Sequence, residues 1–171
     1  MSRILLADES PHAQRMGERM LRDEGFEVVT VTDGETAALR MADVDPDLVL
    51  VDIGLAKKNG YELCQFVRSD PRFSATRVIL TAAATASLDD ERARRVGCDA
   101  TLRKPFELTS LLEASRPLLE YARRERASRA PVAESNIDRE KIRAAVTLAL
   151  DAAMPAMINE LTEKVIASLK D

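Results

Sequence analysis

The stretch LVLVD at Leu48–Asp52 decides the fold of this 171-residue chain. Four branched apolar residues follow the turn signal DPD at positions 45–47, and such a run predicts a short strand buried on both faces of a parallel sheet. Asp52 stands where this buried strand ends. An aspartate there can simply cap a loop, but open α/β sheets also bind ligands beyond the carboxyl ends of their strands. Asp52 is therefore a candidate site residue.

Strand and helix patterns alternate along the first 116 residues. The predicted strands are 3–7, 26–31, 48–51, 77–81 and 100–102, and the predicted helices are 10–24, 33–43, 59–69, 88–96 and 106–116. Signals such as Pro11 in a first helical turn and Gly97 just past a helix end place the boundaries. Strands that are each followed by a helix imply right-handed crossovers and a parallel sheet covered on both faces. The predicted fold class is a doubly wound α/β fold with a five-stranded parallel sheet and a C-terminal α-helical extension.

Polar residues stand where four of the predicted strands end. Asp8 and Glu9 follow the first strand, Asp52 ends the third, Thr81 ends the fourth and Lys104 follows the fifth. Because parallel strand ends meet at one edge of a sheet, three carboxylates would converge there and would need a cation, for which we expect Mg²⁺. Lys104 adds a second positive charge and Thr81 a hydroxyl. Together these groups would stabilise a phosphoryl group during its transfer to Asp52 as the nucleophile.

The motifs at these strand ends are ILLADESP (4–11), LVLVDIGL followed by NG (48–60), VILTA (78–82) and LRKPF (102–106). In this order and spacing they resemble the receiver domain of bacterial two-component response regulators, over residues 3 to about 116. The resemblance implies a flavodoxin-like (βα)5 fold and a sensor histidine kinase or phosphotransfer protein that phosphorylates Asp52.

The resemblance also implies a role for each site residue. Mg²⁺ would be bound by Glu9, Asp52 and the backbone carbonyl of Gly54, with Asp8 holding it through water. Thr81 and Lys104 would contact the acyl phosphate. A cis peptide would join Lys104 to Pro105, a geometry that X-Pro bonds alone tolerate well.

Three positions depart from the family pattern. Glu9 stands where a second aspartate is usual, and its longer side chain could shift Mg²⁺ binding. Ala56 replaces a common proline, and Thr101 replaces a Tyr or Phe whose burial reports phosphorylation in the family. A degenerate receiver that acts as a constitutive interaction module is thus an alternative. A phosphohydrolase with Asp52 as nucleophile is another, but Gly54 stands where that class needs a second acid.

Composition limits the partners and the location. The net charge is -4, whereas a general nucleic-acid binder needs a basic surface, so we expect no DNA partner. No targeting segment is recognisable and no apolar run could span a bilayer, so we expect a cytoplasmic protein without membrane contact.

Several other residues have mainly structural interpretations. Cys64 and Cys98 are expected to be buried free thiols, and Met16 and Met20 are expected in the core. His12 is expected to be solvated rather than part of the site.

The loop after Asp52 contains two lysines. Lys57 and Lys58 could steer an anionic phosphoryl donor toward the site, or could belong to a solvated loop. Both interpretations stay open.

The chain is predicted to contain a receiver domain (1–120), a helical extension with a linker (121–136) and a helical tail (137–171). Pro117 should stop or kink the last receiver helix, and the arginine-rich segment 121–129 is expected to be a solvated helix face. In the tail, apolar residues recur at spacings of three and four, and Pro155 should divide it into two helices, kinked or paired as a hairpin.

The apolar stripe of the tail needs a cover, which the receiver, a second copy of the tail or a partner protein could provide. Because a polar linker separates the tail from the receiver, we favour self-association or partner docking through residues 137–171. This predicts a signalling switch whose output is a protein–protein association.

Overall fold

The computed structural model describes residues 1–129 and Thr162. The chain divides into two units, Met1–Ser128 and Arg129–Asp171. The predictions for the linker beyond Arg129 and for the two tail helices therefore lie outside the described residues, except at Thr162, which is helical and exposed. No helix in the described part of the chain is both long and apolar enough to cross a membrane.

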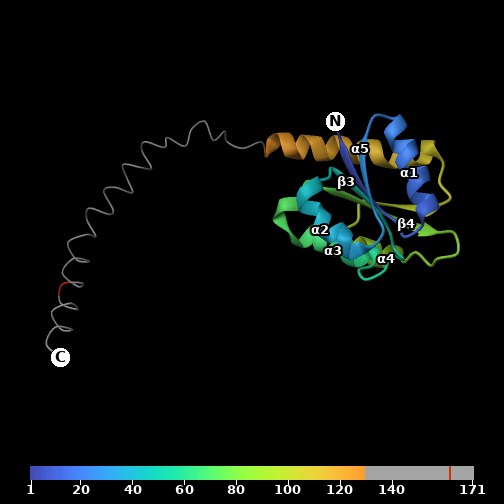
Figure 1. The fold of residues 1–171 in the computed structure, drawn as a ribbon, viewed down its shortest axis with the longest axis horizontal. Coiled ribbons are helices and arrows are strands. Elements are labelled where there is room, and N and C mark those ends of the chain that lie inside the picture. Colours follow the sequence, from blue (N-terminus) through green and yellow to red (C-terminus); the bar gives the residue numbers. More distant parts are fainter. Residues whose placement is uncertain (130–161, 163–171) are drawn as a thin grey trace, which may run out of the picture. The chain divides into compact units, whose positions relative to one another are not determined.

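Residues 1–128 form a five-stranded parallel sheet in the order β2-β1-β3-β4-β5, with helices on both faces (Figure 1). The elements are β1 (Arg3–Ala7), α1 (Pro11–Asp23), β2 (Glu27–Val31), α2 (Gly34–Val44), β3 (Leu48–Asp52), α3 (Gly60–Ser69), the 3₁₀ helix η1 (Pro71–Phe73), β4 (Arg77–Ala83), α4 (Asp90–Arg95), β5 (Ala100–Lys104) and α5 (Leu108–Ser128). This topology confirms the predicted doubly wound α/β fold.

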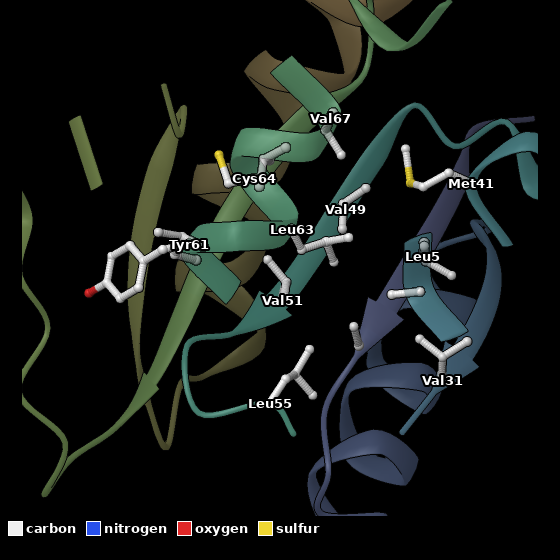
Figure 2. Close-up of a cluster of buried hydrophobic side chains, with 14 of the residues drawn as sticks. Leu5, Val31, Met41, Val49, Val51, Leu55, Tyr61, Leu63, Cys64 and Val67 are labelled. Atoms are coloured by element: carbon white, nitrogen blue, oxygen red, sulfur yellow. The ribbon is translucent and has the colours of Figure 1, made fainter. Parts of the chain in front are cut away.

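The central strand β3 is buried on both faces because its side chains alternate between two apolar clusters. Leu48 and Leu50 pack with residues of α1 and α5, whereas Val49 and Val51 pack with residues of α2 and α3 (Figure 2). All four side chains are at most 1% exposed. Burial of each contributes roughly 1.5–3 kcal/mol, so this strand fixes the middle of the sheet and the position of Asp52 at its end.

Three strands extend further than the apolar pattern predicted. β3 includes Asp52, β4 continues to Ala83 and β5 continues to Lys104. The helix α4 is shorter than predicted and begins only at Asp90, because the side chain of Asp89 caps it by accepting a hydrogen bond from the Arg92 backbone N–H at 2.9 Å. Asp52 and Lys104 are thus the last residues of their strands, whereas Thr81 lies within β4 and Asp8 directly follows β1.

Of the two outcomes predicted at Pro117, a stop or a kinked continuation, the structure excludes the stop, because α5 runs through Pro117 to Ser128. A proline inside a helix costs about 3 kcal/mol because it removes a hydrogen bond and clashes with the preceding turn. Buried Leu119 and Ala122 continue the apolar face beyond the proline and offset this cost.

The side chain of Arg126 also holds the end of α5 against the body. It donates hydrogen bonds from Nη1 to Asp45 Oδ2 at 2.6 Å and from Nη2 to the Pro46 carbonyl at 2.9 Å. Its Nε lies 2.8 Å from Asp47 Oδ1. The prediction of a solvated face for residues 121–129 is therefore wrong at Arg126.

The sulfur-containing residues divide between core and surface. Cys64 is buried as predicted, and this burial raises the pKa of its thiol to about 12. Cys98 is only half-buried. Met20 packs against the α1–α5 cluster, but Met16 is 41% exposed, so the core prediction is wrong for Met16.

Candidate functional site

The side chains of Asp8, Asp52 and Lys104 meet at the carboxyl edge of the sheet. The ammonium of Lys104 lies 2.5 Å from Asp8 Oδ2 and also forms an ion pair with Asp52 Oδ2. Asp8 is buried and the other two side chains are half-buried. Three residues from the ends of three strands thus form one charged cluster that is shielded on most sides.

The loop after β1 holds Asp8 in place through several hydrogen bonds. The Ser10 backbone N–H donates to Asp8 Oδ1 at 2.9 Å, and the Asp8 N–H donates to the Val31 carbonyl at 3.1 Å. The Gln14 side chain donates to the carbonyls of Asp8 and Val31, the latter at 2.9 Å. Sequence reasoning did not single out Gln14, because its role depends on contacts between β1 and β2 that no local pattern reveals.

The turn after β3 orients Asp52. The Gly54 backbone N–H donates to Asp52 Oδ1 at 2.6 Å. The helix α3 starts so close that a Cβ on Gly60 would lie 2.7 Å from the Asp52 carbonyl oxygen, so only glycine fits there. Asn59 caps α3, with its side chain accepting from the Glu62 N–H at 3.0 Å and the Glu62 carboxylate accepting from the Asn59 N–H at 2.9 Å. The NG signal in the sequence marks this turn.

Thr81 lies beside Asp52, since the two residues are register partners in β3 and β4. Its side chain is 2% exposed, and its carbonyl accepts a hydrogen bond from the Ile53 N–H at 2.9 Å. The peptide bond between Lys104 and Pro105 is cis, as the family resemblance implied.

Glu9 is placed differently from the other acidic residues. Its side chain is exposed, and within residues 1–129 no group of three or more acidic, histidine or cysteine side chains is arranged to hold a metal ion. The structure thus gathers Asp8 and Asp52, and the role of Glu9 stays a prediction.

The electrostatics of the cluster keep Lys104 charged. Burial by itself lowers the pKa of Lys104, but the hydrogen bonds to Asp52 and Asp8 outweigh it and raise the pKa above its ordinary value. The carboxylates of Asp8 and Asp52 both form ion pairs with the Lys104 ammonium. Carboxylate and backbone carbonyl oxygens are the ligands that Mg²⁺ prefers, so the donors at this edge fit Mg²⁺.

Comparison with known proteins decides the family. The model of the response regulator receiver domain family matches residues 4–116. The chain belongs to this family. Receiver domains are signalling domains that bind Mg²⁺ and accept phosphoryl groups from histidine kinases, and the matched region ends before the last part of α5 and the tail.

Two relatives and one solved structure illustrate the similarity. PilG of Pseudomonas aeruginosa is 32% identical over 112 residues, which cover 66% of this chain and 83% of PilG. The DNA-binding response regulator MtrA of Mycolicibacterium smegmatis is 31% identical over 136 residues, covering 80% of this chain but only 58% of MtrA. The receiver domain of the sensor histidine kinase PA1611 of P. aeruginosa, solved with a magnesium ion coordinated in its active site cleft, is 28% identical. It aligns with a TM-score of 0.61 over 71% of this chain and 97% of that domain. The predicted family and the flavodoxin-like fold are confirmed.

Proposed function

We propose that this receiver domain is a phosphorylation-dependent switch in the cytoplasm, in which Asp52 accepts a phosphoryl group from a sensor histidine kinase or phosphotransfer protein. The observation that carries the proposal is the ammonium of Lys104 held between Asp8 and Asp52. Because this cation is already fixed beside the acceptor, it can stabilise the negative charge that develops on the phosphoryl oxygens without any reorganisation of the site. The domain carries out only its own phosphorylation and dephosphorylation, and it is not an enzyme that turns over a separate substrate.

The chain's own residues have distinct roles in the transfer. An oxygen of Asp52 forms the new P–O bond as the P–N bond of the donor phosphohistidine breaks. Lys104 pairs with the phosphoryl group, and the Thr81 hydroxyl on the neighbouring strand donates a hydrogen bond to it. Mg²⁺, when bound, neutralises the developing charge on the phosphoryl oxygens. We assign its ligands to Glu9, Asp52, the Gly54 carbonyl and, through water, Asp8.

An apolar groove of about 400 Å³ borders Lys104 and is suited to the phosphodonor. Its walls include His12, Met16 and Met20 of α1, the loop after β4, and Pro105 and Phe106. His12 is exposed, as predicted. We propose that a helix of the donor protein lays its apolar side chains in this groove, which would bring its phosphohistidine to Asp52.

The output of the switch is proposed to be protein association through residues 137–171. The apolar stripe in the sequence of the tail needs a partner surface, and a second copy of the chain or another protein would provide it. The relative MtrA is named as a DNA-binding response regulator. For this chain we propose no DNA contact, because acidic residues outnumber basic residues in the tail.

The phosphorylation proposal is tested by incubating the full chain with Mg²⁺ and acetyl phosphate and measuring its intact mass. The wild type should gain one phosphoryl group and lose it slowly, and Asp52→Asn should gain none. Asp43→Asn, which changes an exposed aspartate of α2, is the matched control and should behave like the wild type. No labelling of the wild type would favour the degenerate receiver, and repeated release of phosphate from a phosphoester would favour a hydrolase.

The output proposal needs a separate experiment. Sedimentation of the full chain with and without beryllofluoride, a phosphoryl mimic, should reveal a change of mass in the wild type. Ile142→Asp in the apolar stripe should abolish the change, and Thr162→Asp at an exposed position should not. Identical monomers in both states would exclude self-association and leave a partner protein as the output.

A further inference from the structure

The loop between β3 and α3, residues 53–59, directly follows the acceptor Asp52 in the chain. Its Gly54 N–H already bonds the Asp52 carboxylate at 2.6 Å. Leu55 anchors the loop by inserting its side chain, 4% exposed, into the apolar cluster shown in Figure 2. The conformation of this loop therefore controls how Asp52 is oriented.

The first turn of α2 lies directly against the far side of this loop. The Gly34 backbone N–H donates to the Ala56 carbonyl at 3.2 Å. A Cβ added to Gly34 would lie 1.7 Å from the Lys58 carbonyl oxygen and 2.7 Å from its carbon. These atoms belong to the backbone, so any side chain at position 34 would displace the loop.

Lys57 closes the same contact from the loop side. Its backbone has a φ of 64°, a left-handed conformation that non-glycine residues rarely adopt. Its ammonium lies 3.6 Å from Asp33 Oδ2 and 3.9 Å from Glu35 Oε2. Asp33 is itself fixed as the cap of α2, because it accepts hydrogen bonds from the N–H and the hydroxyl of Thr36 at 2.9 and 2.8 Å.

Lys57 is exposed, with 58% of its side chain accessible, which agrees with the solvated-loop interpretation. Its ammonium nevertheless lies near two carboxylates at the start of α2 and thus links the loop to that helix. Lys58 differs, since its ammonium lies 4.8 Å from the centre of the Phe66 ring. Adjacent lysines thus have different partners, which makes them a matched pair for experiment.

We propose that Gly34 and Lys57 are positioning residues that clamp the acceptor loop onto α2 and thereby set the rate at which Asp52 is phosphorylated. This inference rests on the proposed function. The clamp pre-orders the loop before the donor arrives, so that Asp52 and the Gly54 carbonyl do not have to be ordered during the reaction.

The test compares Lys57→Met with Lys58→Met, which remove the same charge from neighbouring positions. Lys57→Met should slow phosphorylation by acetyl phosphate about threefold, the scale of a surface ion pair, and should speed amide hydrogen exchange in residues 53–58 of the metal-free protein. Lys58→Met should change neither quantity, and Lys57→Arg should restore both.

Gly34→Ala tests the contact between the Gly34 and Lys58 backbones. It should slow phosphorylation by at least about tenfold, because displacing a positioned reactive group by about 1 Å can lower a rate by about a hundredfold. Ala42→Gly, at an exposed position of α2, controls for a general weakening of that helix. If Gly34→Ala fails to fold, the lysine variants still decide. Normal phosphorylation and exchange in Lys57→Met would overturn the clamp while leaving the proposed function intact, whereas an unphosphorylated wild type would overturn the proposed function itself.

Discussion

Replacement of Lys104 by methionine isolates the electrostatic design of the site. Methionine keeps much of the apolar stem but removes the ammonium that holds Asp8 and Asp52 together. The two carboxylates would then face each other without a cation. Because both oxygens contact the same ammonium in the wild type, they lie no more than about 5 Å apart, and two such charges repel by ~3 kcal/mol at an effective dielectric constant of about 20.

The expected cost in the metal-free protein is therefore about 3 kcal/mol of unfolding free energy, within the range for breaking a mostly buried ion pair. Urea denaturation followed by far-ultraviolet circular dichroism, with a chelator present, measures this loss. Mg²⁺ should then stabilise Lys104→Met, by about 2.7 kcal/mol at a concentration of 100 times its dissociation constant. Lys58→Met is the control and should change stability by less than about 1 kcal/mol.

The ion pairs of Lys104 also make the stability of the folded protein depend on pH. The pKa of Lys104 is raised in the folded state, so its ion pairs stabilise the protein fully below the unfolded pKa of about 10.4. This stability is lost as the pH rises through the folded pKa, and the wild type should then approach Lys104→Met. Equal stability of the two proteins at neutral pH without metal would refute the reasoning.

Three further predictions concern the scaffold. Leu50→Ala should lower the unfolding free energy by about 3 kcal/mol in denaturant titrations, since the side chain is 1% exposed; a loss below 1 kcal/mol would contradict the described packing. The hydrogen bond from Arg126 holds the pKa of Asp45 below its usual range, so the ion pair adds to the unfolding free energy above about pH 4, and this contribution is lost as the pH falls through the folded pKa. In Arg126→Met the unfolding free energy should therefore fall less steeply with decreasing pH than in the wild type, and an unchanged pH dependence would count against the contact. A thiol reagent at pH 8 should modify Cys98 in the native protein and Cys64 only after unfolding, because Cys64 is buried with a pKa of about 12; native labelling of Cys64 would show that α3 opens.

The sequence predicted the order and type of the strands because β3 is apolar on both faces and its neighbours end in turn signals. It could not predict that β5 continues to Lys104, since pairing with β4 extends that strand beyond its apolar residues. The sequence left open whether α5 stops or continues at Pro117 for a related reason. Local propensity argues for a stop, whereas tertiary contacts of Leu119 and Arg126 hold the helix together.

At the site, the convergence of strand ends was enough to single out Asp8, Asp52, Thr81 and Lys104. The supporting residues escaped notice because their roles arise from contacts between distant segments. Gly34 is an example, since in the sequence it marks only a helix start, and its closeness to the Lys58 carbonyl appears only in three dimensions. The exposure of Met16 likewise depends on a groove formed with the loops after β4 and β5.

The most direct test of the central claim is to locate the phosphoryl group by chemistry. The chain is incubated with Mg²⁺ and acetyl phosphate, the acyl phosphate is reduced with borohydride, and the peptides are mapped by mass spectrometry. Asp52 should be the single reduced position, and omission of Mg²⁺ should abolish the reduction. Reduction at another aspartate, or labelling that does not depend on Mg²⁺, would contradict the account.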